Sequence, residues 1–120
     1  MHSLFPIKAL DTKSTTLCVY GMSPVQDKEK RDTIINFFKR FLNESKNSQS
    51  FLSKFYRFIA GYENSNITIE INLLHESEQL PVSHTCFYRI DIPYVGTYEQ
   101  FKSKLNKSIE YGYNDQFALL

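Results

Sequence analysis

The sequence has no tryptophan, only two cysteines, four glycines and four prolines, and almost no net charge. Lysine and arginine together number 14 against 13 acidic residues, so the chain lacks the basic excess that is typical of nucleic-acid-binding domains. No apolar run approaches the roughly 20 residues of a membrane span, and the first ten residues lack the apolar stretch of a secretory signal. We therefore expect an intracellular protein, in the cytoplasm, the nucleus or both, that binds neither nucleic acid nor membranes.

Two cysteines are too few for a disulfide framework. Cys18 and Cys86 lie far apart in the sequence, and an intracellular chain keeps its thiols reduced. We expect one or both of them to be packed as small apolar side chains. A Cys18–Cys86 disulfide is the less favoured alternative.

The residue types that usually hold a metal or a phosphate are also sparse. The three histidines, His2, His75 and His84, have no CxxC or HxxxH partner nearby, whereas zinc needs three or four ligands. The glycines are scattered, so none belongs to a phosphate-binding loop. Asp91 is interpreted as a solvated charge or a turn residue. The sequence therefore predicts no metal site and no cofactor.

Ten phenylalanines and eight tyrosines provide the material for one aromatic-rich core. In the first helical pattern the apolar residues recur at i, i+3, i+4, i+7 and i+8 from Ile34 to Leu42. A second stripe runs from Phe51 to Ile59, and a third begins at Phe101. Residues 1–14 show no periodicity and are interpreted as a tail or a hinge remnant. Residues 15–120 are predicted to form one domain.

Periodicity and capping residues predict three strands and three helices. The expected strands are Thr15–Tyr20, Ile67–Leu74 and Thr85–Ile92. The expected helices begin at Ser23-Pro24, at Ser50 (ending at Gly61) and at Thr97 (ending at Gly112), the last with a Thr97/Gln100 capping box. The expected polar loops are Asn43–Ser50 and His75–Ser83. The order β-α-α-β-β-α indicates a small α+β fold, a sheet of short strands packed with about three helices.

Cys86 is the strongest candidate for covalent chemistry. A thiol is intrinsically nucleophilic and is partly ionised at neutral pH, and His84 stands two residues away, on the same face of the expected strand. A lone His-x-Cys pair is nevertheless more often incidental than catalytic. The pair by itself therefore leaves both interpretations open.

Four short motifs follow one another between Leu80 and Gly112. They are Leu80-Pro81, His84-Thr85-Cys86-Phe87, Asp91-Ile92-Pro93 and Lys104-Leu105. This series resembles the catalytic end of HECT-type ubiquitin ligases. The resemblance continues more loosely through Phe51–Gly61, Ile34–Phe41 and Thr15–Gly21, and it covers about residues 11–120.

The resemblance implies the carboxy-terminal lobe (C-lobe) of such a ligase. In this family the cysteine takes ubiquitin from a charged conjugating enzyme as a thioester, which a substrate lysine then attacks. By motif position Cys86 is the nucleophile, His84 and Thr85 position or polarise the thioester, and Phe87 anchors the catalytic loop in the core. Phe117, fourth from the end, matches a family phenylalanine that orients the lobe. The alternative for Phe117 is a tail that docks into its own core.

The implied partners are ubiquitin, a ubiquitin-charged conjugating enzyme and a protein substrate. HECT ligases also have a larger amino-terminal lobe that recruits the conjugating enzyme, and residues 1–11 match at most its hinge end. A recruiting lobe is therefore a further expected partner. The stretch between Gly61 and Ile67 is shorter than is usual in the family, so the surface beside the catalytic loop is expected to differ.

Two other functions remain as alternatives. The chain can be a non-catalytic module that binds ubiquitin or a ligase and acts as a decoy or regulator. The intact His84-Thr85-Cys86-Phe87 motif argues against that reading. A cysteine hydrolase would need a separate His/Asn partner set, and the sequence offers none in a recognisable context.

Overall fold

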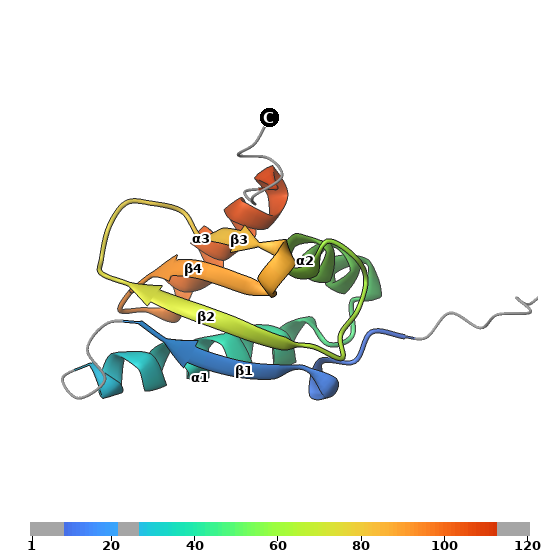
Figure 1. Cartoon of the computed structure of the whole chain (residues 1–120), viewed down its shortest axis with the longest axis horizontal. Coiled ribbons are helices and arrows are strands. Elements are labelled where there is room, and N and C mark those ends of the chain that lie inside the picture. Colours follow the sequence, from blue (N-terminus) through green and yellow to red (C-terminus); the bar gives the residue numbers. More distant parts are fainter. Residues whose placement is uncertain (1–8, 22–26, 113–120) are drawn as a thin grey trace, which may run out of the picture.

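The computed structural model describes residues 9–21 and 27–112, which form a mixed sheet and three α-helices (Figure 1). The strands are β1 (Thr16–Tyr20), β2 (Thr68–Leu74), β3 (Val82–His84) and β4 (Arg89–Pro93). The helices are α1 (Lys28–Ser45), α2 (Gln49–Ala60) and α3 (Tyr98–Tyr111), with short 3-10 turns at Thr12–Ser14 and Thr85–Phe87. The expected α+β class is confirmed.

The sheet has the strand order β1-β2-β4-β3. Strands β1, β2 and β4 run parallel, whereas β3 is antiparallel to β4. Isoleucines and a leucine alternate with polar residues along β2 and β4, so each of these central strands has one buried face. The helices pack against that face (Figure 1), and the opposite face stays open to solvent.

Helix α1 extends further at its carboxyl end than its sequence pattern predicts. The expected start at Ser23-Pro24 lies outside the described residues, and the described part of α1 begins at Lys28. The expected loop Asn43–Ser50 is wrong in most of its length, because α1 continues to Ser45 and α2 already begins at Gln49. The side chains of the polar last turn of α1 are exposed or bond to α3, as Glu44 does to Tyr98, so their polarity is compatible with a helix.

The caps of the other two helices are set by single side chains. Ser48, not Ser50, caps α2: its hydroxyl accepts a hydrogen bond from the Phe51 N–H. Gly61 ends α2 in the left-handed conformation, at φ 84°, as expected. Thr97 caps α3 by accepting a hydrogen bond from the Gln100 N–H, and this expectation is confirmed.

Phe101 on α3 is the centre of an aromatic cluster that joins the helices. It is fully buried. Its ring lies 5.1 to 6.2 Å, between centroids, from four other aromatic rings: Phe37, Phe38 and Phe41 on α1, and Tyr98 on α3. Most of these pairs are tilted or edge-on, which is the arrangement that aromatic quadrupoles favour.

We predict that Phe101→Ala lowers the free energy of unfolding by about 3–5 kcal/mol, because it removes a buried ring and leaves a cavity. Phe87→Ala, at a position that is 63% exposed, is the control and should change it by less than about 0.5 kcal/mol. Urea unfolding followed by circular dichroism measures both. Equal losses in the two variants would contradict this assignment of the core.

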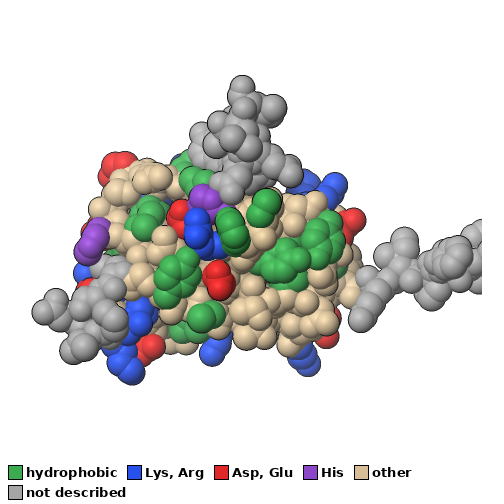
Figure 2. All heavy atoms as spheres, in the orientation of Figure 1, with side chains coloured by type: hydrophobic (Ala, Val, Ile, Leu, Met, Phe, Trp, Pro, Cys, Tyr) green, Lys and Arg blue, Asp and Glu red, His purple; other side chains and the backbone are tan. Residues whose placement is uncertain are grey.

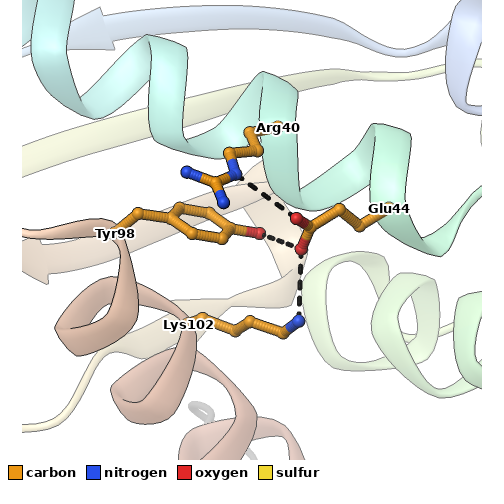
Figure 3. Close-up of polar contacts among 4 residues, drawn as sticks. All are labelled: Arg40, Glu44, Tyr98 and Lys102. Atoms are coloured by element: carbon orange, nitrogen blue, oxygen red, sulfur yellow. Dashed lines mark hydrogen bonds and ion pairs between the residues drawn. The ribbon is translucent and has the colours of Figure 1, made fainter.

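A polar network on the surface also joins α1 to α3 (Figure 3). The Tyr98 hydroxyl donates to Glu44 Oε1 at 2.6 Å, Lys102 Nζ donates to the same oxygen at 3.1 Å, and Arg40 Nε donates to Oε2 at 3.3 Å. The Arg40 guanidinium also lies over the Tyr98 ring, 4.1 Å from its centroid. The hydrogen bonds from Tyr98 and Lys102 lower the pKa of Glu44 from 4.5 to about 2. Burial and the bond to Glu44 raise the pKa of Tyr98.

We predict a pH-dependent stabilisation by Glu44. Because the pKa of Glu44 is depressed in the folded state, its contribution is fully present above pH 4.5 and is lost as the pH falls toward about 2. Wild type should therefore melt at a higher temperature than Glu44→Gln near neutral pH, and the difference should shrink across that window. The control is Glu110→Gln, which removes an exposed carboxylate on α3 that lies outside the Glu44 network. A difference that stays constant down to the acid end would contradict the prediction.

Candidate active site

Cys86 lies at the tip of a tight hairpin formed by β3 and β4. His84 pairs with Arg89 at the last rung of the hairpin, so Thr85 to Tyr88 form the connection. The first three of these residues make a 3-10 turn, and Cys86 is exposed on it. The expected strand Thr85–Ile92 is therefore wrong over Thr85–Tyr88, where the chain reverses direction, and is confirmed over Arg89–Ile92, which belongs to β4. Cys86 and His84 consequently do not share a strand face.

The reversal requires an unusual backbone conformation at Tyr88. This residue closes the turn in the left-handed region, at φ 52° and ψ 41°, and it is the one non-glycine residue with positive φ in the described part of the chain. Such a conformation costs an L-residue about 1–2 kcal/mol. The Tyr88 hydroxyl is 2.7 Å from that of Tyr62, and the two rings are in contact. That hydrogen bond raises the pKa of Tyr88 and lowers that of Tyr62.

Three contacts anchor the hairpin to the helices behind the sheet. The fully buried Ser83 hydroxyl donates to the Phe58 carbonyl on α2 at 2.5 Å. The Ser108 hydroxyl on α3 donates to the Pro81 carbonyl at 2.6 Å. At the end of α2, Gly61 passes close to the turn: a Cβ placed there would lie 3.6 Å from the Thr85 Cβ. The exposed thiol thus stands on a firmly held base.

Polar side chains connect three strands on the open face beside the turn. His84 Nε2 is 2.6 Å from Asp91 Oδ2, and Asn72 Nδ2 donates to Asp91 Oδ1 at 3.0 Å. Arg89 Nε also forms an ion pair with Asp91 Oδ1, at 3.4 Å. His84 and Asp91 are only 20% and 23% exposed. Figure 2 views this face and shows histidine, acidic and basic side chains gathered there among hydrophobic ones.

The site residues predicted from the sequence differ in how far they are exposed to solvent. Cys86 is exposed and His84 is half-buried. Thr85 is buried against Gly61, which favours an anchoring role over direct contact with a thioester. The expectation that Phe87 is a core anchor is wrong, because its side chain is 63% exposed and lies beside the Arg89 guanidinium. Phe117 lies outside the described residues.

Both cysteines are free and exposed, so the expectation that they pack as small apolar side chains is wrong. Cys18 lies on the open face, because it is one of the exposed residues that alternate along β1. Its strand β1 is three positions from β3 in the sheet, and strands are spaced by about 4.8 Å, so a Cys18–Cys86 disulfide is geometrically excluded.

Within residues 9–21 and 27–112 no three His, Cys, Asp or Glu side chains come together as a metal site. None of the helices in those ranges is long and apolar enough to cross a membrane.

Sequence reasoning missed Asp91, Asn72 and the Tyr62–Tyr88 pair. Asp91 stands between two buried isoleucines in β4, so its alternation does indicate an outward side chain. Its two partners come from β2 and β3 and depend on the strand register. No short motif contains that register.

The chain belongs to the HECT-domain (ubiquitin-transferase) family, whose model matches residues 10–120. It is 33% identical over 91 residues to a bifunctional serine/threonine-protein kinase/NEDD4-like E3 ubiquitin-protein ligase of Dictyostelium discoideum, over 69% of this chain and 4% of that protein. It is 49% identical over 35 residues to the E3 ubiquitin-protein ligase RSP5 of Saccharomyces cerevisiae, over 29% of this chain and 4% of that protein. The matched segments are thus a small part of either relative.

We predict that Gly61→Ala destabilises the protein by about 1–2 kcal/mol, because it places a side chain in the left-handed region, at φ 84°. Gly96→Ala is the matched control, since no atom lies within 4 Å of a Cβ at that position. Thermal melting of both variants measures the effect. A Gly61→Ala variant as stable as Gly96→Ala would contradict the left-handed conformation at the end of α2.

Proposed function

We propose that Cys86 accepts ubiquitin as a thioester and passes it to a lysine of a protein substrate. The observation that carries this proposal is the exposed thiol on the tip of an anchored hairpin, within the segment that matches the ubiquitin-transferase family. A thiol nucleophile divides one difficult transfer into two easier ones. Exchange between two thiols needs little driving force, and attack by an amine on the thioester is then downhill.

The surroundings of Cys86 suit a protein as the incoming group. Phe87 and Tyr62 are 63% and 50% exposed, and both belong to the turn or to the segment that touches it. Large apolar side chains kept in water beside a nucleophile provide contact area for a partner. The partners of the proposed reaction are ubiquitin, a ubiquitin-charged conjugating enzyme, a protein substrate and a recruiting lobe, all within the cell.

We predict that Cys86→Ala abolishes a thioester that wild type forms. The protein is incubated with activating enzyme, charged conjugating enzyme and ubiquitin, and products are separated with and without reductant. Wild type should give a reductant-sensitive adduct of one ubiquitin. Cys18→Ala is the matched control, because it removes the other exposed thiol and should leave the adduct intact.

The same assay is repeated with ubiquitin that has a small-molecule thioester at its carboxyl terminus. This reagent loads the thiol by exchange and does not need docking of a conjugating enzyme. An adduct that persists in Cys86→Ala, or no adduct with either donor, would overturn the proposal. Ubiquitin binding that survives Cys86→Ser without any adduct would instead support the non-catalytic decoy or regulator.

A further inference from the structure

A groove lies between the edge strand β1 and the helix α1. β1 is the outermost strand in the order β1-β2-β4-β3, and α1 packs along it (Figure 1). The groove has a volume of about 470 Å³, which is within the range of sites that bind ligands. Its lining comes from residues 12–17 on the strand side and from residues 35–46 on one side of α1. This surface is at the other edge of the sheet from β3, and so away from the Cys86 hairpin.

The lining contains apolar side chains that are withdrawn from solvent. Leu17 of β1 and Ile35 of α1 are half-buried, and Leu42 of α1 is 5% exposed. Ile35 and Leu42 are two helical turns apart, so both face the same side of α1. Because Leu17 and Ile35 keep part of their surface accessible at the groove, an apolar side chain of a partner gains contact area there.

The charged side chains of the lining are all lysines. Lys13, Lys39 and Lys46 are exposed, and none of them forms an ion pair within residues 9–21 and 27–112. The acids nearby in the sequence are engaged elsewhere: Asp11 accepts a hydrogen bond from the Lys13 backbone N–H and lines a different hollow, and Glu44 bonds to α3. The groove therefore presents positive charge that only a partner can neutralise.

The backbone of β1 is unpaired along the same edge. The Thr16 N–H donates to the Ile67 carbonyl at 2.9 Å, so Thr16 directs its backbone groups toward β2. Successive residues of a strand direct these groups to opposite sides, so Leu17 and Val19 direct theirs away from β2. No other strand of the described residues lies on that side. Such an edge is a template on which an extended peptide adds as a further strand.

We propose that this groove binds an acidic segment of a partner protein, which adds to β1 as an extended strand. The backbone of Leu17 and Val19 pairs with the segment, and its side chains on the helix side lie in the groove. Lys39 and Lys46 are about 10 Å apart along the axis of α1, and side chains at i and i+4 of a strand are about 13 Å apart. The matching segment thus has two acids four residues apart, with an apolar residue midway.

Charge favours this occupant over two others. A second copy that paired through its own β1 would bring the same lysines to the same edge, and like charges placed opposite each other destabilise strand pairing. A nucleic acid needs basic side chains along a longer path, whereas the whole chain has a net charge of only +1. A short acidic peptide satisfies the lysines, the apolar lining and the free backbone together.

We predict that a fluorescein-labelled peptide with the central sequence glutamate, threonine, valine, threonine, glutamate binds to the protein. Lys39→Glu should weaken this binding by roughly five-fold, the upper end for one exposed ion pair. Fluorescence anisotropy measures the affinity. Lys107→Glu is the matched control, because it makes the same change of charge at an exposed position of α3 outside the groove. It should bind the peptide as wild type does.

Two further ligands separate the kinds of partner. A copy of the peptide with glutamine in place of both glutamates should bind more weakly than the acidic peptide, and Lys39→Glu should not weaken it further. A thymidine oligomer of the same length tests a nucleic acid. Equal affinity for the oligomer and the acidic peptide would show general binding of polyanions and would overturn the proposal.

Hydrogen exchange of backbone amides tests the strand addition itself. In the peptide complex the Leu17 and Val19 amides should exchange more slowly than in the free protein, because they gain a hydrogen-bond partner. The Thr16 and Cys18 amides should change less, since they face β2 in the ladder. Amide exchange followed by NMR needs no variant, so the proposal stays testable even if Lys39→Glu melts early.

Four results would overturn the inference. The first is no binding of the acidic peptide by wild type, and the second is equal weakening by Lys39→Glu and Lys107→Glu. The third is binding without slower exchange at Leu17 and Val19. The fourth is exchange at these two amides that slows in the free protein as its concentration rises, because a second copy would then occupy the edge. None of these results bears on the thioester proposed for Cys86.

Discussion

The site depends on one strand that is hydrogen-bonded on both sides. β4 pairs in parallel with β2 and antiparallel with β3, and these two pairings set the backbone path around Cys86. The antiparallel pairing forces the chain to reverse within Thr85–Tyr88, which puts the thiol on a tip in solvent. The parallel pairing brings Asn72 beside Asp91, and Asp91 thereby becomes the link between β2 and His84.

The rest of the molecule holds that arrangement steady. The aromatic cluster around Phe101 and the Glu44 network fasten α1 to α3. Two hydrogen bonds then hold the segment that leads into the hairpin. The Ser108 hydroxyl on α3 donates to the Pro81 carbonyl, and the Ser83 hydroxyl donates to the Phe58 carbonyl on α2. A left-handed residue such as Tyr88 persists only where its surroundings impose it, and such strain gathers at functional sites. A thiol that meets a large protein donor and then a large acceptor needs a turn that is held firmly by the helices and a side chain that is exposed to solvent.

Local signals were sufficient for the presence of the three helices and for β2, but not for every helix end. The three amphipathic stripes, Gly61 and the Thr97 cap act within one or two turns, so their physics is visible in neighbouring residues. Apart from the cap of α2, the errors in the helices and strands fall where a longer-range contact decides. The last turn of α1 is polar, yet Glu44 bonds to α3 and the helix continues. The run Thr85–Ile92 has good strand composition throughout, but pairing between β3 and β4 makes its first half, Thr85–Tyr88, a turn.

The sequence alone was enough for the fold class and for the resemblance to HECT ligases, and it singled out Cys86 as the candidate nucleophile, because these depend on composition, periodicity and a contiguous motif. Only the tertiary structure shows that Phe87 and both thiols are exposed, because the burial of a side chain depends on which other elements pack against it. The contacts of Asp91 also depend on the tertiary structure. Its partners lie 19 residues before it and seven residues before it in the sequence, and only the register of two strands on either side of β4 brings a carboxylate, an amide and an imidazole into one hydrogen-bonded chain.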